Sequence, residues 1–339
     1  MALNLSKSNF SQFPLVLIAP FFLWGTAMVA MKGVIPQTTP LFLGGLRLVP
    51  AGLLVLLFGL LSGRDRHISW QGWLWIGLFA LVDGLMFQGF LAEGLVKTGA
   101  GLGSVMIDSQ PLAVALLSSW LFGEVIGLWG WLGLGFGILG ISLIGIPDAW
   151  ILALFQGDLS FFQWENLGIS GEVLMLGASL SMAVGTILIR YVSRHADPVM
   201  ATGWHMILGG IPLFIASDQL ETLQWQFIST SGWWALAYAT IFGSAIAYGL
   251  FFYLASEGNL TSLSALTFLT PVFALIFGNV LLNEKLSPLQ WVGVGLTLVS
   301  IYLINQREKI AAWFSQAEAA AGVGTPQDSK IPVESSKRN

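Results

Sequence analysis

Residues 111–124 read PLAVALLSSWLFGE, and residues 271–284 read PVFALIFGNVLLNE. Each segment begins with a proline, continues through mostly apolar residues and ends in a glutamate. An offset of 160 positions separates both the two prolines and the two glutamates. The same offset relates Gly25-Thr26 to Gly185-Thr186, and an offset of 158 relates Arg47 to His205. This repetition predicts that the chain contains two copies of one structural unit.

The composition indicates an integral membrane protein. Of the 339 residues, 55% are hydrophobic and only 9% are charged, whereas about 25% of the residues of a soluble domain are charged. The net charge of −4 gives no reason to expect a nucleic-acid partner. With no cysteine and three scattered histidines, we expect no disulfide, no metal site and no cofactor.

Ten segments are apolar enough to cross a membrane, since a spanning helix needs roughly 20 mostly apolar residues. The expected spans are 14–32, 39–61, 71–92, 99–122, 128–147, 169–191, 199–217, 231–254, 261–282 and 288–305. The first is kept as a span, because no small-residue cleavage site follows it and the repeat requires it. Each copy has an odd number of spans, so the two copies enter the membrane from opposite sides. The sequence therefore predicts an all-α integral membrane protein of ten transmembrane helices, arranged as two inverted five-helix repeats.

The expected organisation follows from this repeat. Residues 1–147 form the first repeat, 148–168 an extracytoplasmic loop, 169–306 the second repeat and 307–339 a disordered cytoplasmic tail. Lys and Arg in short loops set the orientation. With a cytoplasmic N-terminus, seven of them lie inside and three outside, so we expect both termini in the cytoplasm and the protein in the inner (plasma) membrane.

The sequence resembles the EamA-type transporters of the drug/metabolite transporter superfamily. The motifs that carry the resemblance are WGTAMVAMKGVIP with a following Pro and Arg (24–50), PLAVALLSSWLFGE with WGWLGLGFGILGISLIG (111–145), and PVFALIFGNVLLNEKLSPLQWVGVGLTLVSIYLI (271–304). The resemblance implies ten helices, a central cavity lined mainly by helices 1, 3, 4, 6, 8 and 9, and export or exchange of small metabolites such as amino acids. Asp83, Glu93 and Asp108 depart from the commoner family pattern and leave the substrate open.

Ionisable side chains inside a membrane are costly, so each is a functional candidate. Arg47 is a candidate clamp for a carboxylate, because guanidinium presents a rigid fork of donors. The alternatives are a structural ion pair with Asp83 or Asp108, a bond to a free carbonyl, or snorkelling toward the cytoplasm. His205, at the equivalent position, is either a proton-sensitive switch or a hydrogen-bonded core histidine.

Two further groups are candidates for binding a substrate. Asp83, Phe87 and Gln88 present a carboxylate, a ring and an amide on one part of a helix. The prolines of IDSQP (107–111) and TFLTP (267–271) each free a backbone carbonyl near mid-membrane. Acidic residues here could bind a substrate ammonium or carry a coupling proton, and a plain packing kink is the alternative. The candidates from these segments are Asp108, Gln110, Pro111, Thr267, Thr270 and Pro271.

Aromatic and terminal residues complete the candidates. Trp24 and Tyr248 are aromatic candidates for a cavity wall, although packing in the core or against lipid is the alternative. Glu124 and Glu284 lie at helix ends, where the macrodipole repels a carboxylate. We interpret them as structural or gating groups that accept donors at the start of the fifth and tenth helices.

The sequence favours a secondary transporter that moves small organic solutes by alternating access. The expected partners are a small-molecule substrate, the lipid bilayer and a coupling proton, in a monomer or a homodimer. An intramembrane enzyme or a channel-like protein is the alternative. The chain contains no HExxH, GxSxG or Walker A motif, so we expect no enzymatic activity.

Overall fold

The computed structural model describes residues 14–97, 106–156, 171–282 and 286–320. Over these ranges the chain is helical, and no strand occurs among them. Eight helices are long and apolar enough to cross a membrane, and two shorter apolar helices, Leu15–Met31 and Gln110–Phe122, complete the set. The protein is therefore a multi-pass, all-α integral membrane protein whose helices form two five-helix repeats.

The first repeat contains five helical segments in chain order. They are α1 (Pro14–Lys32), α2 (Pro40–Leu61), the composite α3 (Trp70–Phe79), η3 (Ala80–Phe87) and α4 (Gln88–Lys97), then α6 (Gln110–Phe122) and α7 (Gly127–Gly145). A short 3-10 helix, η2 (Ile35–Gln37), links α1 to α2. Pro40 is the first residue of α2. Proline is favoured at this position because the N–H groups of the first helical turn have no partner within the helix, so the N–H that proline lacks is not missed.

The second repeat follows the same order. It contains α9 (Gly171–Val192), α10 (Pro198–Leu220), the composite α11 (Thr230–Thr240), η5 (Ile241–Ile246) and α12 (Ala247–Glu257), the broken α13 (Leu260–Ala265), η6 (Leu266–Phe268) and α14 (Leu269–Leu282), and α15 (Pro288–Ala320). Asp197 caps α10 by accepting the N–H groups of Val199 and Met200. Each expected span thus has a helical counterpart, although 99–105 of the fourth span and 169–170 of the sixth lie outside the described residues.

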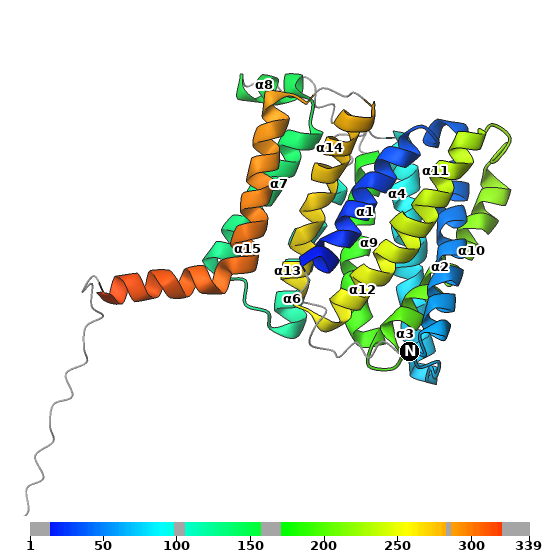
Figure 1. The fold of residues 1–339 in the computed structure, drawn as a ribbon, viewed down its shortest axis with the longest axis horizontal. Coiled ribbons are helices and arrows are strands. Elements are labelled where there is room, and N and C mark those ends of the chain that lie inside the picture. Colours follow the sequence, from blue (N-terminus) through cyan, green and yellow to red (C-terminus); the bar gives the residue numbers. More distant parts are fainter. Residues whose placement is uncertain (1–13, 98–105, 157–170, 283–285, 321–339) are drawn as a thin grey trace, which may run out of the picture.

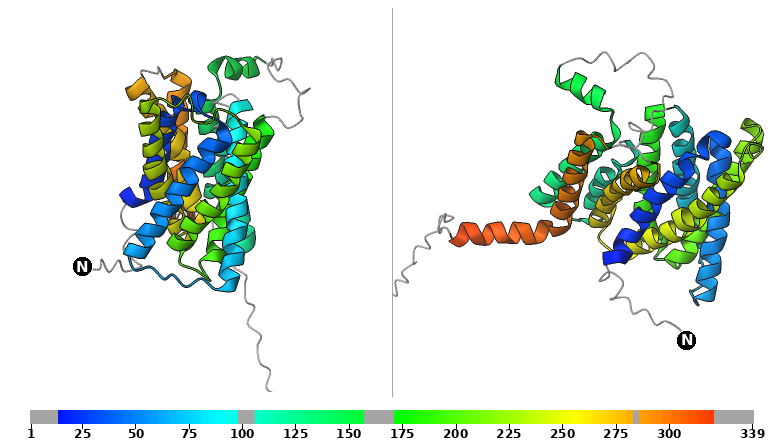
Figure 2. Two further views of the ribbon diagram at one scale, coloured as in Figure 1. Left: turned by 90° about the vertical axis from the view of Figure 1, so that its right-hand side faces the viewer. Right: turned by 45° about the horizontal axis from the view of Figure 1, so that its top comes forward.

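Equivalent helices of the two repeats pack against each other. The pair α2 and α10 forms one edge of the bundle, and α7 and α15 form the opposite edge (Figure 1; Figure 2). Glycine permits this packing: a Cβ on Gly52 would lie 2.6 Å from Gly203 O, and one on Gly133 would lie 2.6 Å from Ile304 Cγ1. The glycine-rich face of α7 therefore contacts a helix of the same chain.

The structure corrects two boundaries. The segment expected as a loop at 148–168 begins with a helix, α8 (Asp148–Phe155), and its residues from 157 onward lie outside the described part. The tail expected to be disordered from 307 is helical as far as Ala320, because α15 continues past the span and bends away from the bundle (Figure 1). Apolar Trp129 and Phe314 stack at 5.0 Å, a contact that holds this extension against the start of α7.

Candidate functional site

Each repeat interrupts its third helix with a π-helical segment. The first, η3, contains Asp83, and the second, η5, contains Ser244. Under the 160-residue offset, the two segments occupy equivalent positions in their repeats. π-helical turns are rare and occur frequently at functional sites. The polar side chains of the candidate site converge on these two segments.

Asp83 and His205 form a fully buried pair between η3 and α10. Asp83 Oδ2 lies 3.1 Å from His205 Nε2, and each side chain is 1% exposed. The other ring nitrogen, Nδ1, lies 2.6 Å from the carbonyl oxygen of Thr202. Because a carbonyl oxygen only accepts hydrogen bonds, Nδ1 carries a proton and donates it to Thr202. Phe79 stacks on the imidazole with 3.9 Å between ring centroids, so the ring is fixed on its face as well as at both nitrogens.

Glycines bring the elements around this pair into close contact. A Cβ on Gly209 of α10 would lie 2.4 Å from the Cα of Gly84 in η3. On the other side of η3, a Cβ on Gly185 of α9 would lie 2.5 Å from Asp83 Oδ1. The Asp83 carboxyl group is thus enclosed between α10 and α9, and Oδ1 is oriented toward α9.

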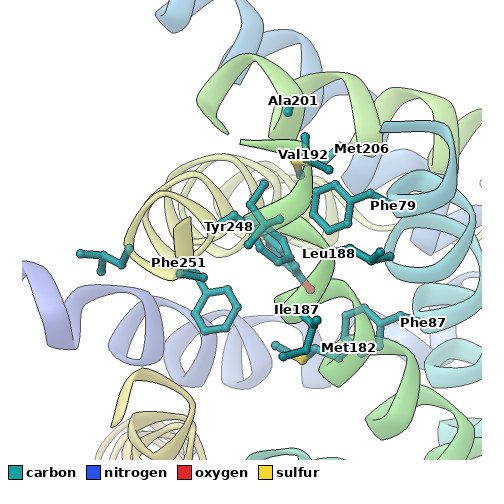
Figure 3. Close-up of a cluster of buried hydrophobic side chains, with 14 of the residues drawn as sticks. Phe79, Phe87, Met182, Ile187, Leu188, Val192, Ala201, Met206, Tyr248 and Phe251 are labelled. Atoms are coloured by element: carbon teal, nitrogen blue, oxygen red, sulfur yellow. The ribbon is translucent and has the colours of Figure 1, made fainter. Parts of the chain in front are cut away.

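Gln88 and Tyr248 connect the two repeats at equivalent positions. Gln88 Nε2 donates to the Tyr248 hydroxyl group at 2.9 Å, and the two residues are 160 positions apart. A residue can contact its own equivalent only near the axis that relates the two repeats, so this hydrogen bond marks that axis. Figure 3 shows Tyr248 among apolar side chains that include Phe79, Phe87 and Leu188.

Arg47 of α2 bonds a π-helical segment, as His205 does from the equivalent position in α10. Its Nη2 donates to Ser244 Oγ of η5 at 3.2 Å, whereas His205 contacts Asp83 of η3. Each second helix therefore bonds the π-helical segment of the other repeat. The expected alternatives for Arg47, an ion pair with Asp83 or Asp108, do not occur among the described residues.

Several buried polar atoms of this region have no hydrogen-bond partner within the described ranges. They include Arg47 Nε and Asp83 Oδ1, one potential donor and one acceptor of opposite charge. A buried polar group without a partner is costly, so such atoms point to a binding role. A small void lined by Leu48, Asp83, Gln88, His205, Met206 and Tyr248 lies at the centre, and it has no room for a water-sized sphere.

The two proline segments interrupt their helices as expected, but the prolines begin the next helix rather than kink a continuous one. Pro111 lies in the first turn of α6, directly after a turn at Asp108 and Ser109. Pro271 lies in the first turn of α14, after the 3-10 helix η6. A proline is tolerated there because the first turn of a helix has no internal partners for its N–H groups.

The polar candidates beside these prolines are buried or half-buried, and their hydrogen bonds are incomplete. Gln110 Nε2 donates to Thr186 Oγ1 at 3.2 Å, and Thr267 donates to the Ser264 carbonyl. Gln110 Oε1 and Thr270 Oγ1, which are equivalent positions, are buried without a partner among the described residues. Asp108 is half-buried and forms no hydrogen bond or ion pair in the described ranges.

The aromatic candidates pack in the core around Tyr248. Trp24 lies edge-on to Tyr248 with 5.2 Å between ring centroids, and its buried Nε1 has no partner in the described part of the chain. Phe87 is 3% exposed and belongs to the central apolar cluster. These rings therefore shape the surroundings of the Gln88–Tyr248 contact.

Glu124 binds the start of α13, not the start of the fifth helix as expected. Its carboxylate accepts the backbone N–H groups of Leu260 at 3.1 Å and Thr261 at 3.2 Å, and the Thr261 hydroxyl group at 2.8 Å. It also lies 3.5 Å from Arg190 Nη2 at the end of α9. We call these contacts the Glu124 clamp. The second glutamate, Glu284, lies outside the described residues.

Sequence reasoning missed three residues of this arrangement. Ser244 and Thr186 receive hydrogen bonds from Arg47 and Gln110, and Arg190 pairs with Glu124. Thr186 already stands out as part of the repeated Gly-Thr pair. The offset alone could not show which equivalent positions meet, because that depends on how the repeats pack.

Comparisons with known proteins agree with this architecture. The EamA-like transporter family model matches residues 13–146 and 169–306, one match per repeat. An uncharacterized transporter of Synechocystis sp. is 66% identical over 87% of this chain and 90% of its own length. A chloroplastic WAT1-related protein of Arabidopsis thaliana is 52% identical over 86% of this chain and 68% of its own length.

Two more distant comparisons extend the agreement. The uncharacterized inner membrane transporter YedA of Escherichia coli (strain K12) is 28% identical over 85% of this chain and 89% of its own length. A solved crystal structure aligns with a TM-score of 0.71 over 86% of this chain and 96% of that chain. Its sequence identity is 18%, so this likeness concerns the fold alone.

Proposed function

Because this chain belongs to the EamA-like transporter family and is a membrane transporter, we propose that it moves small zwitterionic metabolites such as amino acids across the membrane. It would do so as a secondary transporter, by alternating access, with export or exchange as its direction. The homologues named as transporters point to a protein that is not an enzyme. In line with the bacterial relative YedA, we place it in the inner membrane with both termini cytoplasmic.

One observation carries the choice of a zwitterion. Arg47 Nε and Asp83 Oδ1 are buried polar atoms without partners in the described part of the chain, and they come from groups of opposite charge. Asp83 and Tyr248 line the same small void, and Arg47 contacts Ser244, four residues before Tyr248. A carboxylate on the guanidinium and an ammonium on the carboxyl group would satisfy both atoms at once. A solute of one charge would leave one of them unpaired.

Alternating access is supported by the closed central void and by the repeat. A substrate has no room in this conformation, so the elements around the void must separate to admit one. Asp83 Oδ1 faces α9 at Gly185, and α9 ends at Arg190 in the Glu124 clamp. Release of the clamp would free α9 and uncover Oδ1. The inverted repeat supplies the second conformation, in which the two halves exchange roles.

Counterflow in proteoliposomes tests the proposal. Vesicles that contain the purified protein and a mixture of unlabelled amino acids are diluted into a trace of the same mixture in radiolabelled form. We expect transient uptake of label that Arg47→Gln lowers at least about tenfold, since a lost charged hydrogen bond costs about 1.5–3 kcal/mol. The matched control is Arg194→Gln, which removes an equal charge from an exposed position.

Three results would overturn this function. No counterflow of any amino acid, with either variant or with the unchanged protein, would remove the amino-acid assignment. Uptake that continues at the same rate without internal solute and without saturation would indicate a channel-like protein, and chemical conversion of a supplied solute would indicate an enzyme.

A further inference from the structure

The Asp83–His205 pair has a geometry that fixes its number of protons. His205 Nδ1 must donate to Thr202 O, which lies only 2.6 Å away. The 3.1 Å contact between Nε2 and Asp83 Oδ2 then needs one further proton between the two atoms. That proton belongs either to a neutral carboxyl group that donates to Nε2 or to an imidazolium that donates to a carboxylate. In both forms the pair is neutral and shares one proton.

Removal of the shared proton breaks the pair. The Asp83 carboxylate would then face the lone pair of His205 Nε2, and Oδ2 and Nε2 would repel each other. If the remaining ring proton moved to Nε2, the lone pair of Nδ1 would face the carbonyl oxygen of Thr202 at 2.6 Å instead. The ring cannot escape by turning, because Phe79 stacks on it and Phe252 contacts it edge-on. The contact between η3 and α10 therefore depends on this proton.

Other ionisable groups do not replace the proton. The ionisable groups of other helices near the site are Tyr248 of α12, which lines the same void, and Arg47 of α2, which donates to Ser244. Of the neighbours on α9 and α3, Gly185 and Phe79 carry no charge. Of the charges at the far ends of packed helices, Glu93 pairs with Lys97, Arg190 pairs with Glu124, and Asp218 of α10 is exposed. No cation among these residues contacts the Asp83 carboxyl group in place of the shared proton.

We propose that the Asp83–His205 pair is a binding site for one coupling proton, and that the ammonium group of the solute displaces this proton from Asp83. The proposal rests on the proposed function, since it uses Asp83 Oδ1 as the ammonium ligand. An ammonium group needs a carboxylate, and an imidazolium beside it would repel it. The shared proton therefore leaves to the open side when the solute binds, and one proton returns when the solute departs. No covalent bond changes, and one proton is exchanged for one solute molecule.

Proteoliposomes with an imposed pH gradient provide the first test. The probe is the radiolabelled amino-acid mixture, and the lumen is one pH unit more acidic than the outside. With an exchange of one proton for one solute, we expect accumulation in the lumen up to about tenfold, because one pH unit corresponds to a tenfold ratio. A protonophore should abolish the accumulation. Asp218→Asn, which removes an exposed carboxylate of α10, should leave it unchanged.

The outcomes separate the two proposals. Counterflow without accumulation under the gradient would overturn the proton site and leave the proposed function intact. Absence of both counterflow and accumulation would overturn the proposed function itself. Accumulation of label to about tenfold that an excess of unlabelled amino acids does not reduce would contradict the displacement of the proton by the ammonium group.

The second test locates the proton and needs no transport. The chain has three histidines, so the variant His67→Gln/His195→Gln keeps only His205. Nitrogen NMR of its ring in detergent should show Nδ1 protonated and Nε2 in a hydrogen bond. Saturation with the amino-acid mixture should shift Nε2 toward a free lone pair. Asp83→Asn should remove that response while it keeps a hydrogen bond to Nε2, because its amide donates without titrating. An Nε2 signal that ignores the amino acids, or that responds equally in Asp83→Asn, would overturn the assignment.

Discussion

The Glu124 clamp predicts a measurable shift in conformational equilibrium when its carboxylate is removed. Glu124→Ala leaves two N–H groups at the start of α13 and one hydroxyl group without their acceptor. Loss of a helix N-cap costs about 0.5–2 kcal/mol, and the partly exposed ion pair with Arg190 adds at most about 1 kcal/mol. The side chains of this pair are 10% and 22% exposed, so water would rehydrate part of what is lost.

The expected total is about 2 kcal/mol, which favours opening about 30-fold, since 1.4 kcal/mol is a factor of ten. The protein contains no cysteine, so a single introduced thiol reports on opening. Ser118 is fully buried and its Oγ lies 2.9 Å from Thr261 Oγ1, directly beside the clamp. The rate of maleimide labelling of Ser118→Cys should rise about 30-fold when Glu124→Ala is added.

Two comparisons decide the outcome. Glu308→Ala removes an exposed carboxylate of α15 and should leave the labelling rate unchanged. Glu124→Gln, which can still accept one N–H, should give an intermediate rate. The comparison is between Ser118→Cys with and without Glu124→Ala. If both proteins are folded and label at the same rate, the carboxylate does not hold the two repeats closed, and the reasoning above is wrong.

Three further predictions concern packing, polar pairing and topology. Gly209→Ala should lower the thermal unfolding midpoint in detergent, because its Cβ would lie 2.4 Å from Gly84 Cα and overpacking costs about 1–3 kcal/mol; Gly295→Ala, with open space around it, is the control. Tyr248→Phe should cost about 1–3 kcal/mol of stability by leaving the buried Gln88 amide unpaired, and adding Gln88→Leu should restore most of it. Gln156→Cys in whole cells should react with an impermeant maleimide from the outside only.

Each of these has a result that contradicts it. Equal unfolding midpoints for Gly209→Ala and Gly295→Ala would mean that η3 and α10 are not in close contact. If the Tyr248→Phe protein is as stable as the unchanged one, the hydrogen bond between Gln88 and Tyr248 does not stabilise the centre of the bundle. Labelling of Gln156→Cys only after the cells are opened would reverse the orientation that the Lys and Arg counts predict.

The repeat in the sequence predicted the architecture well, because it depends on local hydrophobicity and on chain order. The expected span 14–32 and α1 have the same bounds, and 39–61 differs from α2 by one residue. The extension of α15 was missed, because the Ala-, Ser- and Gln-rich segment with scattered charges after 307 was interpreted as disordered, although Ala, Glu and Lys all favour a helix. The interrupted helices at Pro111 and Pro271 were expected, but not that the prolines would begin a new helix.

The sequence named individual residues for the candidate site but not the contacts between them. Asp83 and His205 were named because ionisable groups inside a membrane are costly, and both are buried. Gln88 was named together with Asp83, and Tyr248 was named as an aromatic wall residue; Gln88 and Tyr248 are also buried. Their pairing depends on the π-helical segments, and no propensity in the apolar sequence around Asp83 predicts an inserted residue. Glu124 was assigned the wrong helix for a similar reason. The break before α14 turns α13 so that its first N–H groups meet the carboxylate.

The Gln88–Tyr248 hydrogen bond has a consequence for how the two halves move. When inverted repeats trade conformations, contacts away from their common axis must be exchanged for different ones, but a contact on the axis maps onto itself. Gln88 and Tyr248 can therefore stay bonded throughout the cycle, as a fixed pivot. In a symmetric ancestor, one residue would have faced its own copy at this place. An amide facing a phenol instead gives the bond a single direction, so the inward- and outward-facing states are not energetic mirror images.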